Sequence, residues 1–203
     1  MKSKGFVAGM ALLVAAAMAA PRVLNGLGTF LVVEERADKV DAVVTGWIPG
    51  KTLDCYLQGQ CKKIIVALPQ LAPESWLALQ WMRSEKSVRE NAREAGVKDE
   101  DLYLLFVEAE NDLRRAQRFA EFFDEKKIRS VLFLSSYYKT RRNRFYFDRS
   151  LEGNETVVYV QPYEAVPDIH DWWKQTTYAN FFLGEYLRIG WYFFNKLLWT
   201  SAV

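Results

Sequence analysis

The stretch VLFLSSYYKTRRNRFYF, residues 131–147, decides the fold. Its first four residues are apolar, β-branched or aromatic, which predicts a parallel strand buried on both faces. The strand stops at Ser135 and Ser136, and a basic segment that begins at Tyr137 predicts a helix. The open crevice of an α/β protein lies at the carboxyl ends of its parallel strands. Because a helix start offers free N–H groups and the basic side chains offer cations, we expect an anion to bind there.

The basic segment also has a second interpretation. Cationic side chains are typical of the solvated face of an amphipathic helix, whose Phe145 and Phe147 would then lie partly in the core. In the first interpretation Lys139 and Arg142, three residues apart, share one helix face and reach the same anion. Arg142 would then be an exposed cation, and its loss would change folding little. The residues alone leave both interpretations open.

Length and composition limit the possible classes of protein. The chain has 203 residues, half of them hydrophobic, which suits one domain with appendages. Its net charge of +2 lacks the cationic excess of a nucleic-acid-binding protein. We therefore expect no nucleic-acid partner, and any anion site must be local.

The N-terminus has the pattern of an export signal. Lys2 and Lys4 precede an apolar run over residues 6–20. Either Ala17-Met18-Ala19 is a cleavage site, or the N-terminus is an uncleaved signal anchor. We assign this anchor to residues 1–26, and its helix would recruit Val23 and Leu24, and run on toward Leu27, to approach the roughly 20 residues of a membrane span. We favour a single-pass anchor in the inner (plasma) membrane, with the following domain in the periplasm or otherwise outside the cytoplasm.

The rest of the chain alternates predicted strands and helices. After a connector over residues 27–39, we expect one α/β domain over residues 40–203 that ends in an aromatic-rich helix. Pro69 and Pro73 are expected to break the chain after the second strand. The pattern predicts a Rossmann-like sheet of about five mainly parallel strands with helices on both faces. The expected strands, besides the one at 131–134, lie at 40–46, 62–68, 101–107 and 156–160, and the expected helices at 52–60, 74–95 and 111–126.

The chain from Asp168 onward is rich in Trp, Phe and Tyr. Glu185, Arg188 and Lys196 make it too charged to span a membrane. We expect this helix to pack on the sheet, with lipid headgroups as a second possible neighbour for its outer aromatic residues.

Few residues belong to a known catalytic, nucleotide-binding or metal-binding motif. His170 is the one histidine and lies near two Trp residues, which favours a structural role, and a metal site is not expected. No nucleophile elbow, P-loop or dinucleotide fingerprint occurs. Cys55 and Cys61 flank a predicted helix end, so a disulfide is permitted in an exported domain, although spacing alone does not establish it.

The order of these segments resembles the SanA/ElyC/YdcF family, also called domain of unknown function 218. Four segments carry the resemblance, and Trp172, Trp173 and Glu185 resemble the family's C-terminal end. The resemblance implies a Rossmann-like domain, often tethered by one N-terminal helix on the periplasmic side and linked in some members to envelope integrity, without a settled activity. The segments are LGTFLVVEERADKVDAVVTG (27–46), CYLQGQCKKIIVAL (55–68), AGVKDEDLYLLFVEAEND (95–112) and SSYYKTRRNRF (135–145).

This chain departs from the family pattern at three places. Lys139 stands where the family usually has histidine, which removes a group that titrates near neutral pH. Gly46 is followed by Trp47 in place of further glycine, and Asn111 is followed by aspartate in place of threonine. Whether catalysis is retained is therefore open, and the sequence names no reaction or cofactor.

These observations lead to two hypotheses of function. In the first, a membrane-tethered envelope protein binds an anionic, phosphate-bearing or lipid-linked ligand at the strand ends. In the second, the protein is a noncatalytic envelope scaffold that uses its aromatic C-terminal helix, with an unknown protein partner. The expected ligand-binding residues are Gly46, Trp47, Glu108, Asn111, Ser136, Tyr138, Lys139 and Arg142.

Overall fold

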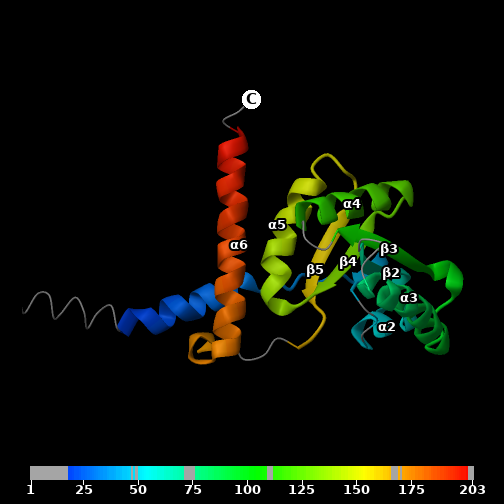
Figure 1. Ribbon diagram of the computed structural model, residues 1–203, viewed down its shortest axis with the longest axis horizontal. Coiled ribbons are helices and arrows are strands. Elements are labelled where there is room, and N and C mark those ends of the chain that lie inside the picture. The colour runs from blue at the N-terminus through cyan, green and yellow to red at the C-terminus, as the bar shows by residue number, and fades with distance from the viewer. Residues whose placement is uncertain are drawn as a thin grey trace, which may run out of the picture. The chain divides into compact units, whose positions relative to one another are not determined.

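The chain divides into two compact units. The computed structural model describes residues 18–46, 48, 50–70, 76–108, 112–165, 169 and 171–200 (Figure 1). The core unit is Val33–Ala165, and the terminal unit combines Met1–Val32 with Val166–Val203. These boundaries differ from the expected connector at 27–39 and single domain over 40–203, because the two ends of the chain pack on each other and form a unit of their own.

A five-stranded parallel sheet forms the centre of the core unit. Its strands are β1 (Val40–Thr45), β2 (Cys61–Gln70), β3 (Leu102–Glu108), β4 (Ser130–Ser135) and β5 (Val157–Pro162). Their order is β3-β2-β1-β4-β5, and every neighbouring pair is parallel. The predicted Rossmann-like α/β fold is confirmed.

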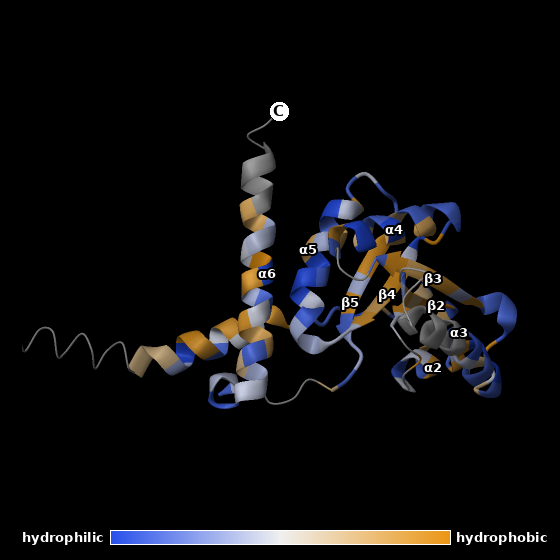
Figure 2. Ribbon diagram, viewed as in Figure 1, coloured by the Kyte–Doolittle hydropathy of each residue, from blue (hydrophilic) through white to orange (hydrophobic). Residues whose placement is uncertain are grey.

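Helices cover both faces of this sheet (Figure 1). α4 (Asp112–Glu125) and α5 (Thr140–Ser150) pack on one face, where Phe119, Phe123 and Phe147 meet alternate strand residues. α2 (Gly50–Leu57) and α3 (Trp76–Glu94) pack on the other face. Because side chains alternate along a strand, Val131 and Leu132 of β4 belong to opposite cores. Figure 2 shows largely hydrophobic strands in this sheet and largely hydrophilic residues along α4 and α5.

Pro69 lies inside β2, so the expectation that it breaks the chain is wrong. It pairs in register with Val107 of β3. A proline cannot donate to a strand ladder, which normally confines it to positions with a free side. The pairing of β1 with β2 ends at Thr45 and Val66, so β2 has a strand neighbour on one side where Pro69 occurs.

The strand order reverses between β1 and β4, which makes their carboxyl ends the topological switch point of the sheet. The carboxylate of Asp41 holds the amino ends of these strands together by accepting hydrogen bonds from the N–H groups of Arg129 and Ser130 at 3.1 Å. A hydrogen bond from Lys62, together with those from the backbone N–H of Arg129 and the hydroxyl of Ser130, holds the pKa of Asp41 below its ordinary value. The register of β1 against β4 is therefore anchored at the end opposite the crevice.

The terminal unit consists of a helix over residues 18–31, a short 3-10 helix η3 (Trp172–Lys174) and α6 (Thr176–Thr200). The indole of Trp172 stacks on Phe182 with ring centroids 4.9 Å apart, and its N–H donates to the carbonyl of Leu24 at 2.7 Å. A side chain at Gly28 would approach the Trp172 ring to 2.7 Å, so glycine permits this packing. No helix in the described part of the chain has both the length and the apolar character needed to cross a bilayer. Residues 1–17, most of the expected anchor, lie outside that part.

Candidate functional site

A cavity of about 440 Å³ opens at the carboxyl ends of the strands in the core unit. It lies at the switch point, since residues directly after β1 and β4 line it. Its volume falls within the range of small-molecule sites. The described residues that line it are Thr45, Gly46, Ala67, Pro69, Val107, Arg115, Phe119, Phe133, Leu134, Ser135, Ser136, Lys139, Asn143 and Tyr163.

Hydroxyl and amide groups form the polar wall of the cavity. The Nδ2 of Asn143 donates to the Oγ of Ser135 at 2.7 Å, and this pair joins the first turn of α5 to the end of β4. The Oγ of Ser136 and the hydroxyl of Tyr163 are hydrogen-bonded at 3.2 Å. The backbone N–H of Tyr163 also donates to the carbonyl of Ser135 at 2.9 Å. The ends of β4 and β5 are thus fixed around the cavity.

Two cations line the same cavity. Lys139 ends the 3-10 helix η2 (Tyr137–Lys139), and its ammonium group lies 5.5 Å from the centroid of the Tyr138 ring. Arg115 comes from α4 on the neighbouring side. None of the described lining residues is an Asp or Glu. An anion in the cavity would therefore meet positive charge without a carboxylate beside it in that part of the wall.

Asp112 connects Arg115 to a second arginine behind the cavity. One carboxylate oxygen of Asp112 pairs with Arg115, and the other pairs with Arg142 of α5. The side chain of Arg142 is 5% exposed, and those of Asp112 and Arg115 are 20% and 25% exposed. Two guanidinium groups share one carboxylate, so this triad keeps one net positive charge next to the cavity.

Aromatic and aliphatic side chains form the apolar part of the lining. Phe119 of α4 packs edge-to-face on Phe133 of β4, with ring centroids 5.6 Å apart. Both rings also contact Phe147 in the core behind them. These rings line the cavity together with Ala67, Val107, Leu134 and Pro69. The lining of the cavity thus combines cations and hydroxyl groups with aromatic and aliphatic side chains.

The structure brings some of the predicted site residues together. Gly46, Ser136 and Lys139 line the cavity. Tyr138 contacts Lys139 from outside the described lining. Glu108 ends β3 at the surface, where it forms an exposed ion pair with Arg114 at 3.4 Å. Trp47 and Asn111, like His170, lie outside the described residues.

Arg142 differs most from its expected role. It was expected to be an exposed cation, and this is wrong because the residue is 4% exposed and paired with Asp112. Helical periodicity within α5 places Arg142 near Lys139. It does not show that a carboxylate of α4, Asp112, pairs with Arg142. Its role as a ligand contact stays a prediction, and in this structure Arg115 is the arginine that lines the cavity.

Four polar residues at this edge were missed by the sequence reasoning. Asn143 and Arg115 lie one turn into the helices that follow β4 and β3, and Tyr163 directly follows β5. Lys51, in the first turn of α2 after β1, donates to the carbonyl of Pro162 at 2.8 Å. Searching the first helical turn after every strand, and the residue after the last strand, would have found them.

Cys55 and Cys61 are free thiols in this structure, and a disulfide between them in an exported domain stays a prediction. Both are buried, and their side chains are hydrogen-bonded to each other. That hydrogen bond, and after it burial, raise the pKa of the Cys61 thiol. The described residues contain no group of three or more His, Cys, Asp or Glu side chains that could hold a metal ion.

Comparison with known proteins gives little beyond the fold class. No family model matches the chain. No curated protein matches it either. A universal stress family protein from Burkholderia pseudomallei is 12% identical, with 63% of this chain and 99% of that chain covered and a TM-score of 0.35. The reductase domain of an aureusimine biosynthetic cluster is 8% identical, with 71% and 54% covered and a TM-score of 0.32. Scores this low do not bear on function.

We predict that Arg142→Ala destabilises the protein, in contrast to the loss of an exposed cation. The substitution removes a buried guanidinium from Asp112 and leaves the space of its side chain, which should lower the free energy of unfolding by about 2 to 4 kcal/mol. Urea unfolding followed by circular dichroism measures this change. Arg118→Ala is the matched control, because Arg118 lies on α4 with a 46% exposed side chain and should change stability by less than about 0.5 kcal/mol. Equal stability of the two variants would contradict a structural role for the Asp112–Arg142 pair.

Proposed function

We propose that the core unit binds an amphipathic anion, with a phosphate group at the cationic side of the cavity and an apolar group at the aromatic side. The proposal rests on the set of residues that line the cavity. Lys139 and Arg115 lie in a cavity whose described wall has no carboxylate, and Phe119 and Phe133 form part of the same wall. A lipid-linked or otherwise apolar phosphate of the cell envelope has this combination of groups.

The polar side suits a phosphate group better than a carboxylate. A phosphate offers several acceptor oxygens, and the cavity offers one ammonium, one guanidinium and the hydroxyls of Ser136 and Tyr163. Arginine recognises such oxygens with two parallel N–H groups, while lysine contributes a point charge. The contacts of Arg115 with Asp112 hold its guanidinium in place, which reduces the entropy lost when a ligand binds.

The apolar side supports an organic substituent on that phosphate. The contacts of Phe119 and Phe133 with Phe147 hold both rings in the core, so they present a preformed surface. Burying hydrocarbon against such a surface contributes about 25 cal/mol per Å² of apolar area removed from water. Inorganic phosphate has no hydrocarbon that could contact Phe119 and Phe133. We therefore expect it to bind more weakly than a phosphate ester with a hydrocarbon chain.

The side chains of the cavity favour binding over acid-base catalysis. The hydroxyls of Ser135 and Ser136 are hydrogen-bonded to an amide and to a phenol, respectively. An amide does not accept a proton near neutral pH, so the partner of Ser135 cannot act as a general base. Lys139 occupies the position at which the resembling family usually has a histidine. We therefore propose that this chain binds its ligand without catalysing a reaction, even if other proteins of the resembling family are catalytic.

The setting that we propose is the outer side of the inner membrane. The resemblance to the SanA/ElyC/YdcF family supports it, as does the pattern of Lys2 and Lys4 before an apolar run. An N-terminal membrane tether would place the cavity near envelope precursors that carry phosphate and hydrocarbon. The second candidate function, a noncatalytic envelope scaffold, is favoured by the exposed aromatic residues of α6.

We predict that the purified full chain binds geranyl phosphate more tightly than it binds inorganic phosphate or geraniol. Lys139→Ala and Arg115→Ala should each weaken binding of the ester about ten-fold or more, because each removes a charge-assisted contact. Isothermal titration calorimetry measures the dissociation constants, and urea unfolding of each variant corrects for the folded fraction.

Arg118→Ala is again the control, since Arg118 is a cation of the same helix outside the described lining. If it weakens binding as much as Arg115→Ala, net charge and not the cavity determines affinity. Equal affinities for ester and inorganic phosphate would contradict the amphipathic ligand and leave an anion site. The absence of binding by every ligand would favour the scaffold hypothesis.

We also predict that a reporter fused after Val203 is active only when exported. Alkaline phosphatase, which needs the periplasm, should be active in the fusion, because lysines before the apolar run keep the N-terminus in the cytoplasm. A cytoplasmic reporter at the same position should be active at background level. The reverse pattern would overturn the proposed location but would not affect the binding proposal.

A further inference from the structure

A third cation lies beside the cavity, outside its described lining. Lys51 belongs to the first turn of α2, and its ammonium group donates to the carbonyl of Pro162 at 2.8 Å. Pro162 pairs in register with Ser135, and the next residue, Tyr163, donates its backbone N–H to the Ser135 carbonyl. Ser135 and Tyr163 both line the cavity. The ammonium group of Lys51 therefore lies at the rim of the cavity.

The protein satisfies this ammonium group only in part. An ammonium has three N–H donors, and within the described residues the Pro162 carbonyl is the one acceptor that Lys51 contacts. Lys62, Lys63 and Lys174, by contrast, each pair with an aspartate at 3.0 Å or less. Lys51 can thus donate to an anion without breaking an ion pair in the described part of the chain.

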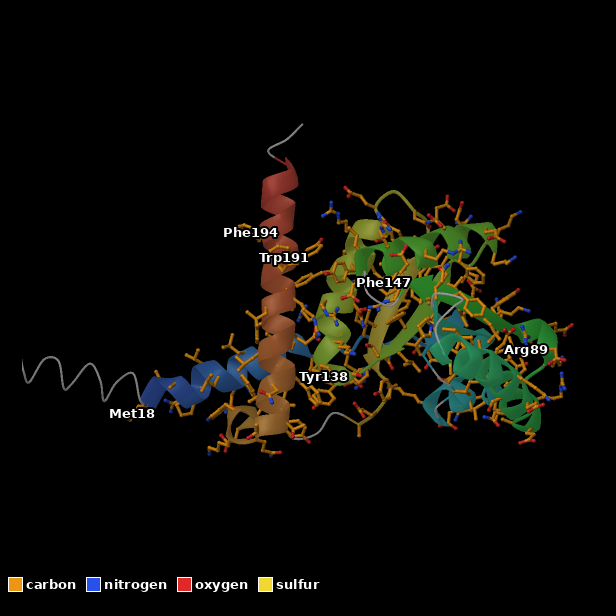
Figure 3. The ribbon with its side chains drawn as sticks, in the orientation of Figure 1. Met18, Arg89, Tyr138, Phe147, Trp191 and Phe194 are labelled. Atoms are coloured by element: carbon orange, nitrogen blue, oxygen red, sulfur yellow. The ribbon has the colours of Figure 1, made fainter. Side chains whose placement is uncertain are left out.

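The topology brings cations to this edge of the sheet from both faces. Lys51 follows β1, Arg115 follows β3 and Lys139 follows β4. The ring that the Lys139 ammonium contacts belongs to Tyr138, which Figure 3 labels. α2 packs on the face of the sheet opposite to α4 and α5, so Lys51 approaches the strand ends from the face opposite to that of Arg115. Cations that gather at one edge in this way attract a ligand with several negative charges.

A diphosphate uses these cations more fully than a monophosphate. One phosphate group carries about two negative charges at neutral pH, and Lys139 and Arg115 of the lining compensate them. A second phosphate group linked to the first adds negative charge and further acceptor oxygens. Lys51, at the rim, is the cation with N–H donors for those oxygens.

We propose that Lys51 binds a second phosphate group, so that the site prefers the diphosphate ester of an apolar alcohol to the corresponding monophosphate. This inference rests on the proposed function, because Lys139 and Arg115 hold the first phosphate group. A hydrogen bond from an ammonium to an anionic oxygen is stronger than one to a neutral carbonyl. Lys51 is therefore a specificity-determining residue, which distinguishes diphosphates from monophosphates.

Calorimetric titration of the full chain with geranyl phosphate and geranyl diphosphate tests this proposal. EDTA in the buffer removes divalent cations, which would otherwise bind the diphosphate. Wild-type protein is compared with Lys51→Met, which removes the charge from an unbranched side chain, and with Lys51→Arg, which keeps the charge. Lys86→Met is the matched control, because the side chain of Lys86 is 80% exposed on α3. Urea unfolding of each variant corrects for the folded fraction.

Wild-type protein should bind geranyl diphosphate about ten-fold more tightly than geranyl phosphate, because the second phosphate group gains a charge-assisted contact. Lys51→Met should abolish this preference and change the affinity for geranyl phosphate by less than about two-fold, because the first phosphate group does not contact Lys51. Lys51→Arg and Lys86→Met should keep the preference.

Equal wild-type affinities for the two esters would overturn this inference and leave the proposed function intact. A preference that survives Lys51→Met would also overturn it, because other residues would then hold the second phosphate group. Equal weakening of both esters by Lys51→Met would show that Lys51 only supports the cavity wall through Pro162. Loss of the preference in Lys86→Met would assign it to net charge. If wild-type protein binds neither ester, the proposed function fails, and this inference fails with it.

Discussion

The proposed site depends on the two ion pairs that the carboxylate of Asp112 forms. Asp112 lies at the start of α4 and pairs with Arg115 of its own helix and with the buried Arg142 of α5. A buried arginine is costly unless a carboxylate compensates it, so α4 and α5 are held in one relative position. The same carboxylate orients the guanidinium of Arg115 at the cavity. Packing of the two helices and placement of a cation therefore have one physical cause.

The position of the cavity follows from the topology of the sheet. The crossovers separate at the switch point between β1 and β4, which leaves space at the carboxyl ends of these strands. Residues that follow the strands contribute the polar groups, whereas α4 contributes both Arg115 and Phe119. Cations and aromatic rings that line one space of about 440 Å³ are the basis for proposing an amphipathic anion as the ligand.

The sequence predicted the sheet more accurately than the site. Each strand is an apolar run between helical segments, so five parallel strands were expected, and only the path through Pro69 was missed. Ser136 and Lys139 were found because they directly follow β4. Arg142 was assigned to the surface because periodicity along one helix does not show that Asp112 of another helix pairs with it. The aromatic residues of α6 occur on all its sides, so their pattern did not show which side is buried or that α6 joins the N-terminal helix.

The central claim is that a tetrahedral oxyanion binds in the cavity between the side chains of Lys139 and Arg115. Tungstate has the shape and charge of a phosphate dianion, and its metal atom scatters X-rays anomalously. Crystals of the full chain grown with tungstate should give a strong anomalous peak at the carboxyl ends of β1 and β4, within hydrogen-bonding distance of both cations. A map in which the strongest peaks lie on other basic residues, with none in the cavity, would contradict this account.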